Sequence, residues 1–149
     1  MSDFRREYRV IWANLDPNRH MRHTAYNDFA AQVRVEFFTE MGMSIEKLVE
    51  MGIGPILFRE DTRFLREVHL NELITVGLSV SKARKDGSKW SIRHSIYKES
   101  GELSCTIDVE GSWLDLEKRK IIAPPQALMN IMLNAPRTQD FEWMADKKV

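Results

Sequence analysis

Four long stretches in which apolar and polar side chains alternate constrain the fold of this chain more than any other feature. The stretches span residues 56–68, 73–84, 89–99 and 103–117. They are rich in β-branched and aromatic side chains, as β-strands are, and Asp86-Gly87 and Ser100-Gly101 between them are typical hairpin residues. Strands joined by such short turns have to be antiparallel. The sequence therefore predicts an antiparallel sheet of long strands.

A helical pattern precedes these strands. Apolar side chains recur every three or four residues over about five turns, which predicts a helix with a broad apolar stripe. The stripe consists of Tyr26, Phe29, Ala30, Val33, Phe37 and Met41. Because the rest of the helix still carries Ala25, Ala31 and Val35, we expect most of its circumference to be buried. A sheet that curls around one central helix would bury it in this way.

Shorter elements are predicted around this helix and these strands. Residues 6–13 have the composition of a first strand, and residues 44–51 form a short helix that begins at Ser44. Residues 125–133 form a closing helix with proline in its first turn. The tail from Pro136 onward has no clear period, and we expect it to be loosely ordered.

The length and charge of the chain limit its class. We expect a single domain over residues 1–149, with a core at about 6–134 and a C-terminal tail at 135–149, because 149 residues are the size of one domain. The formal net charge of zero gives no reason to expect nucleic acid or a membrane surface as a partner. One cysteine, a charged N-terminal segment and the lack of a long apolar run predict a cytoplasmic protein.

A polar segment lies directly before the helical pattern. It carries Asp16, His20, His23 and two arginines, whereas a helix start requires only one or two polar residues. The surplus predicts chemistry in addition to capping, although Asp16-Pro17 is also a frequent turn opener. His20 and His23 form only a His-x-x-His pair, and no cysteine cluster or further His-Glu pair completes it, so we predict no metal site.

The segment from Asp16 to Tyr26, DPNRHMRHTAY, resembles the signature of the 4-hydroxybenzoyl-CoA thioesterase-like family. In that family an aspartate follows the first strand, and a tyrosine lies ten residues later in the central helix. The resemblance covers about residues 6–125. It departs at Arg19, where the family often has glycine, and at Arg22 and His23, where asparagines are common. The resemblance implies an α+β hotdog fold, in which a long antiparallel sheet wraps around a central α-helix.

The resemblance also implies an acyl-CoA thioesterase. Aspartates at the position of Asp16 act as nucleophile or as general base, and both roles stay open here. By position, the backbone N–H of His23 is the donor to the oxyanion, at a helix start whose free N–H groups suit a negative charge. His20 is a candidate for orienting a water or the thioester. Tyr26 fits the apolar stripe and is also a candidate contact to the substrate.

The implied partners follow from the same resemblance. Basic residues near the Asp86-Gly87 turn meet the phosphates of coenzyme A in the family, and Arg84, Lys85 and Lys89 are the candidates here, with a solvated turn as the alternative. The substrate is an acyl-CoA, with an acyl carrier protein as an alternative carrier. No cofactor is implied, and the assembly is a homodimer or homotetramer.

Two other functions stay open on the sequence alone. A hotdog domain can bind acyl-CoA or an acyl carrier protein without catalysis, and a hotdog dehydratase pairs an aspartate with a histidine at nearly the spacing of Asp16 and His20.

Three further groups are predicted to be structural. Cys105 alternates with apolar neighbours and is expected in the core rather than as a nucleophile. His94 lies in the middle of a strand, and a structural role is expected for it. Arg34 and Glu36 on the central helix are expected to form a buried or interface ion pair.

Overall fold

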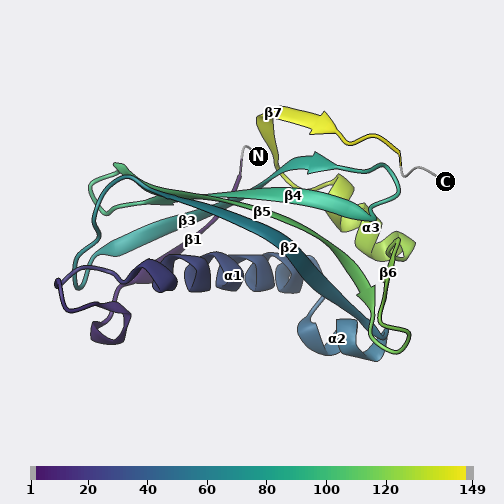
Figure 1. Ribbon diagram of the computed structural model, residues 1–149, viewed down its shortest axis with the longest axis horizontal. Helices are drawn as coiled ribbons and strands as arrows, with labels where there is room; N and C mark the ends of the chain where they lie inside the picture. The colour runs from purple at the N-terminus through teal and green to yellow at the C-terminus, as the bar shows by residue number, and fades with distance from the viewer. Residues whose placement is uncertain (1–2, 147–149) are drawn as a thin grey trace.

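The computed structural model describes residues 3–146, in which a long helix, α1 (His23–Glu40), lies along one face of a twisted sheet (Figure 1). The neighbouring strands run in the order β1-β3-β4-β5-β2, and each is antiparallel to the next. Their bounds are β1 Phe4–Arg9, β2 Ile53–Phe64, β3 Leu73–Ala83, β4 Lys89–Tyr97 and β5 Leu103–Asp115. The predicted hotdog fold class is confirmed. The ends of the predicted domain at residues 1–2 and 147–149 lie outside the described residues.

Shorter elements connect and extend this sheet. They are the 3₁₀ helix η1 Trp12–Asn14, α2 Ile45–Glu50, α3 Gln126–Leu133, β6 Lys120–Ile122 and β7 Arg137–Trp143. Both predicted short helices are present, and the Ser44 side chain caps α2 by accepting a hydrogen bond from Lys47 N–H at 3.2 Å. The first strand ends at Arg9 rather than at residue 13, because the chain turns there into η1.

The apolar stripe of α1 packs against the sheet. Four residues of the stripe are buried, namely Tyr26, Ala30, Val33 and Phe37, and so is Ala25 beside it. The expectation that most of the helix circumference is buried is wrong within one chain, since five of the 18 residues of α1 are buried and Val35 is 36% exposed. Among the described residues, no element covers the side of α1 that faces away from the sheet (Figure 1). None of the described helices is both long and apolar enough to cross a membrane.

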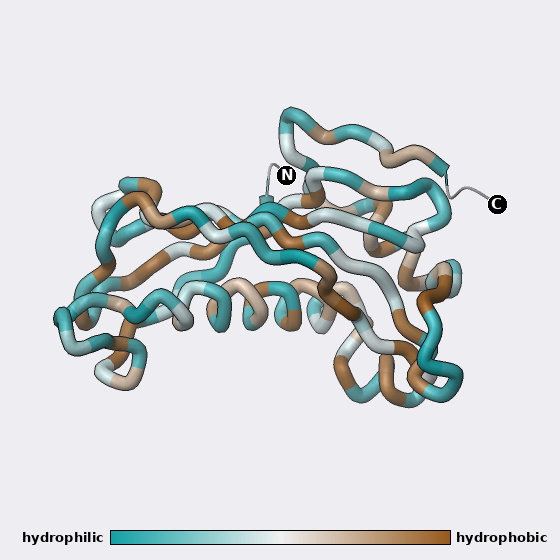
Figure 2. The backbone as a smooth tube through the Cα atoms, viewed as in Figure 1, coloured by the Kyte–Doolittle hydropathy of each residue, from teal (hydrophilic) through white to brown (hydrophobic). Residues whose placement is uncertain are grey.

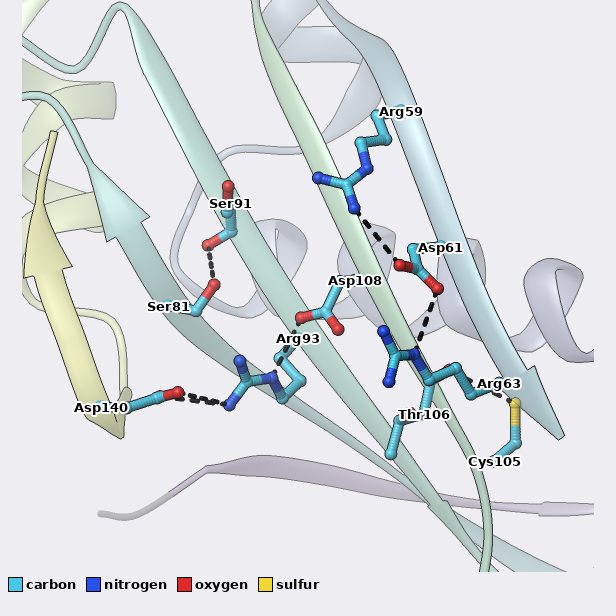
Figure 3. Close-up of polar contacts among 10 residues, drawn as sticks. All are labelled: Arg59, Asp61, Arg63, Ser81, Ser91, Arg93, Cys105, Thr106, Asp108 and Asp140. Carbon is cyan, nitrogen blue, oxygen red and sulfur yellow. Dashed lines mark hydrogen bonds and ion pairs between the residues drawn. The ribbon is translucent and has the colours of Figure 1, made fainter. Parts of the chain in front are cut away.

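The two faces of the sheet differ in polarity. On β5, Cys105, Ile107 and Val109 are buried toward α1 and alternate with more exposed polar residues. The hydropathy along the chain alternates accordingly (Figure 2). The other face carries charged contacts such as Arg93 with Asp108 at 3.0 Å (Figure 3). The side of the sheet that faces α1 therefore forms the core.

The C-terminal residues are more ordered than the sequence indicates. We expected a loosely ordered tail from Pro136, but Arg137–Trp143 form β7, which pairs in parallel with the second half of β3. β1 occupies only the first half of that edge, up to Leu78, so β7 supplies partners to the backbone groups beyond it. The side chains of β7 are mostly exposed on both faces, which explains why no period marks it.

Candidate active site

The polar segment before α1 is held by backbone contacts against the residues that lead into β3. Met21 N–H donates to Val68 O at 2.7 Å, and isolated bridges join Leu15 to Met21 and His20 to His69. The segment therefore forms a folded loop over residues 68–72 and delivers the chain directly into the first turn of α1.

Asp16 lies at the centre of a tight turn in this loop. Its backbone N–H donates to His20 O, its carbonyl accepts from Arg19 N–H, both at 3.0 Å, and Oδ1 accepts from Asn18 N–H at 2.8 Å. Arg19 has φ +71°, in the left-handed region that favours glycine. The turn thus has the conformation that a glycine would adopt without strain, although the chain places an arginine there.

Asp16 and His20 face one another beside a cavity of about 310 Å³. His20 Nδ1 lies 3.4 Å from Asp16 Oδ2, and the two side chains are 31% and 23% exposed. The cavity is lined by Asp16, His20, Met21, His23, Tyr26 and residues 64–67. All four residues predicted to surround the reacting thioester therefore line a single cavity.

The start of α1 has an unbonded backbone donor at His23, a residue of the cavity lining. Arg22 is the N-cap residue, but its side chain makes no capping hydrogen bond. Its guanidinium contacts Ala13 O and Thr24 Oγ1 instead. Within residues 3–146, no hydrogen bond from the His23 N–H is present. The helix start is therefore free to bind a negatively charged oxygen.

Tyr26 forms the inner wall of the cavity. It is 4% exposed, and its ring lies edge-on to Phe64 with 5.2 Å between the ring centroids. Burial raises the pKa of the Tyr26 phenol, so it stays protonated at neutral pH. The other lining residues are Phe64, the last residue of β2, and residues 65–67 that follow it, and no local sequence pattern marks these residues as part of the site.

The predicted phosphate-binding residues lie at the other end of the sheet. Arg84 and Lys85 belong to the β3–β4 turn and Lys89 begins β4, about 33 Å along β3 from the end that lies beside the Asp16 loop (Figure 1). Arg84 donates to Ala145 O at 3.3 Å, and Lys89 pairs with Glu110 at 2.9 Å. The structure therefore does not bring the predicted basic residues and Asp16 together within one chain.

The remaining titratable candidates lie in the core. Cys105 is buried, and burial raises the pKa of its thiol to about 12, which is inconsistent with a nucleophile. Within residues 3–146 of one chain, Arg34 and Glu36 form no ion pair with each other: Arg34 contacts His94 at 2.9 Å, and Glu36 accepts from the Tyr8 hydroxyl. No group of three or more potential ligand side chains is placed to hold a metal ion in the described part of the chain.

A family model for the thioesterase-like superfamily matches residues 10–132. No curated protein sequence matches the chain. Among solved structures, SAV2348 from Staphylococcus aureus, determined in complex with CoA, superimposes with a TM-score of 0.84 at 20% identity over 98% of this chain and 90% of that chain. Slr0204, a 1,4-dihydroxy-2-naphthoyl-CoA thioesterase from Synechocystis, superimposes with a TM-score of 0.80 at 16% identity over 89% of this chain and 96% of that chain. A DHNA-CoA thioesterase from Staphylococcus aureus superimposes with a TM-score of 0.76 at 20% identity over 83% of this chain and 81% of that chain. At these identities the likeness establishes a shared fold.

Proposed function

The chain belongs to the thioesterase-like superfamily, and on this premise we propose that it hydrolyses an acyl-CoA to a free acid and coenzyme A. The observation that carries this proposal is the cavity shared by the Asp16 carboxylate and the uncapped start of α1 at His23. A carboxylate and a free N–H donor on one cavity are the two groups that thioester hydrolysis requires.

The proposed reaction begins at the thioester carbonyl carbon. In one route an Asp16 oxygen attacks this carbon. In the other, Asp16 takes a proton from a water molecule that attacks the carbon. In both, the carbonyl oxygen becomes an oxyanion that accepts a hydrogen bond from the His23 N–H. Collapse of this intermediate breaks the C–S bond, and the thiolate departs easily because the reference pKa of a thiol is about 8.5. In the first route, water then hydrolyses the mixed anhydride and restores Asp16. In the second route, Asp16 passes the proton that it took from water to the departing thiolate, which becomes the thiol of coenzyme A.

His20 and Tyr26 are proposed to position these groups. His20 contacts the Asp16 carboxylate at 3.4 Å, so it can orient the carboxylate or the attacking water. The buried Tyr26 ring would contact the acyl group beside the thioester.

A second copy of the chain is proposed to supply the CoA phosphate contacts. Among the strands of residues 3–146, β2 pairs only with β5, so its other edge is open to an antiparallel β2 of a partner in a continuous sheet. A two-fold axis at this edge makes the partner's sheet run in the opposite direction. The partner's Arg84, the partner's Lys85 and the partner's Lys89 then lie at the end of the sheet where the first copy has Asp16. A homotetramer would contain two such dimers.

The test is thiol release from a panel of short, long and aromatic acyl-CoAs and an acyl carrier protein thioester. We expect the wild type to hydrolyse at least one of them and Asp16→Asn to lose about a hundredfold or more in kcat while remaining folded. Asp28→Asn is the matched control, because Asp28 is an exposed aspartate of α1 whose carboxylate is paired with Arg22. A wild type that binds acyl-CoA without hydrolysing any of the panel would instead identify a non-catalytic binding protein.

A further inference from the structure

The C-terminal strand β7 brings an aromatic cluster to the basic turn between β3 and β4 (Figure 1). In the strand register Trp143 lies beside Ala83, the last residue of β3, and Met144 N–H donates to Ala83 O at 2.8 Å. Arg84 Nε donates to Ala145 O at 3.3 Å. Because neighbouring strands lie about 4.8 Å apart, Trp143 and Arg84 are close in space although they are far apart in the sequence.

Trp143 carries an arginine on its ring. Arg137 Cζ lies 5.0 Å from the centroid of the Trp143 ring and 4.4 Å from that of Phe141, and the two rings meet edge to face. Such contacts hold a guanidinium in place on the ring surface. Within residues 3–146 its N–H groups make one hydrogen bond, to Leu133 O at 3.3 Å, so further donors are left for a ligand. Trp143 is 40% exposed, and part of its indole is therefore open to solvent.

Three cations lie on or near this indole, namely Arg137, Arg84 and Lys85. Within residues 3–146 none of the three forms an ion pair with a carboxylate. Asp86 of the same turn accepts a hydrogen bond from Ser88 Oγ at 2.7 Å, and Arg84 attracts it only from a longer distance. Positive charge is therefore left in this region for an anion.

The two carboxylates of β7 lie beside other cations. Asp140 pairs with Arg93 at 3.1 Å (Figure 3), and Glu142 is next to Lys82 in the strand register. In the described part of the chain, neither forms an ion pair with the three cations near the indole.

An exposed indole with cations around it is complementary to a ligand that has a flat base and several phosphate groups. Bases stack on aromatic side chains, and guanidinium groups bind phosphate oxygens through pairs of N–H donors. The nucleotide end of coenzyme A, an adenosine with a 3′-phosphate and a 5′-diphosphate, has both features. Because β7 (Arg137–Trp143) lies beyond residues 10–132, the family match does not cover the aromatic cluster.

We propose that Trp143 and Arg137 bind the adenine of coenzyme A, whose phosphates contact Arg84 and Lys85. The proposal rests on the proposed function for the identity of its ligand, but it requires no hydrolysis. In the proposed dimer the partner's basic turn lies at the end of the sheet where the first copy has Asp16, so one CoA would contact both copies. The site would also favour CoA over a carrier protein, because a phosphopantetheine arm has no adenosine.

The experiment compares the binding of adenosine 3′,5′-bisphosphate and inorganic pyrophosphate, since only the first probe carries a base. Calorimetry and the quenching of tryptophan fluorescence are recorded at low ionic strength on the full-length wild type, Trp143→Leu and Arg137→Met. We expect the wild type to bind the nucleotide at least about tenfold more tightly than pyrophosphate, the effect of stacking one base on an aromatic ring. Trp143→Leu should lose this preference and bind pyrophosphate as the wild type does. Arg137→Met should bind the nucleotide severalfold less tightly.

Tyr97→Leu is the matched control, because the Tyr97 ring also carries an arginine, with Arg5 Cζ 5.2 Å from its centroid, at the opposite end of β4 from the basic turn. It should bind both probes as the wild type does. Absence of nucleotide binding by the wild type, equal binding of the two probes, or a preference that survives in Trp143→Leu overturns the proposal. If Trp143→Leu does not fold, the wild type and Arg137→Met decide.

The same measurements separate this proposal from the proposed function. A wild type that shows the expected nucleotide preference but hydrolyses no acyl-CoA of the panel supports this site and contradicts the hydrolase. A wild type that hydrolyses an acyl-CoA but binds neither probe overturns this site alone.

Discussion

His94 Nε2 accepts a hydrogen bond from Arg34 Nη1 at 2.9 Å, while His94 Nδ1 donates one to Gly77 O at 2.9 Å. These two contacts assign one neutral tautomer to a histidine that is fully buried in β4. Protonation would place a second cation beside the guanidinium in the core. Burial and the charge of Arg34 together lower the pKa of His94 to about 3.

The depressed pKa of His94 predicts that stability falls as the pH decreases through about 6.5 toward 3. In this window the unfolded chain binds a proton at His94 and the folded chain does not, so protonation favours unfolding. One such proton changes the free energy of unfolding by about 1.4 kcal/mol per pH unit. His94 should therefore lower the free energy of unfolding by about 2 kcal/mol between pH 6.5 and 5. Urea unfolding at a series of pH values measures it.

The control for this pH dependence uses two histidine-to-glutamine variants. His94→Gln should lower the stability at pH 7 and flatten its change with pH, because it removes the buried titrating group. His69→Gln should keep the wild-type slope, since His69 is an exposed residue. Equal slopes for the wild type and His94→Gln would contradict the assignment.

Cys105 should not react with a thiol reagent in the folded protein. It is 0% exposed, and its pKa of about 12 keeps it in the unreactive thiol form. Labelling with an aromatic disulfide reagent should give no adduct in buffer and one adduct per chain in urea. Rapid labelling of the folded protein would show that β5 opens locally.

Arg19→Gly should stabilise the fold, because the φ of +71° costs an arginine energy that glycine does not incur. We expect Arg19→Gly to be about 1 kcal/mol more stable than Arg19→Ala, which keeps the Cβ and removes the charge just as glycine does. The comparison is made by urea unfolding. Equal stability of the two variants would mean that residue 19 does not adopt this conformation in solution.

The elements that could be predicted are those with a local period. The stripe of α1 and the alternation of the long strands repeat within a few residues, whereas β7 has no alternation because most of its side chains are exposed on both faces. The burial of α1 was overestimated because the apolar face around Val35 is left open by the rest of the described chain.

The residues of the candidate site also fall into two groups, those that a local pattern in the sequence predicts and those that it does not. Asp16, His20, His23 and Tyr26 lie within eleven residues, so a turn and the first helical turn are enough to bring them to one cavity. The wall supplied by Phe64 depends on the pairing of β2 with β5, which no local pattern reveals. The Arg34–His94 contact joins residues 60 positions apart and was equally inaccessible to sequence reasoning.

The proposed oxyanion donor can be removed without removing the helix. His23 is the first residue of α1, where proline is well tolerated because its missing N–H has no intrahelical acceptor. The preceding Arg22 has φ −63° and ψ 147°, an extended conformation that a following proline favours. His23→Pro therefore deletes one backbone N–H and leaves the backbone geometry of the helix start unchanged.

We expect His23→Pro to lower kcat for the best acyl-CoA of the panel by about a hundredfold, the effect of losing one donor to an oxyanion, with little change in KM. His23→Ala is the matched variant, since it removes the same imidazole and keeps the N–H, and it should retain most of the activity. Equal losses in both variants would assign the effect to the His23 side chain. A fully active His23→Pro with unchanged unfolding would place the oxyanion donor elsewhere on the cavity wall.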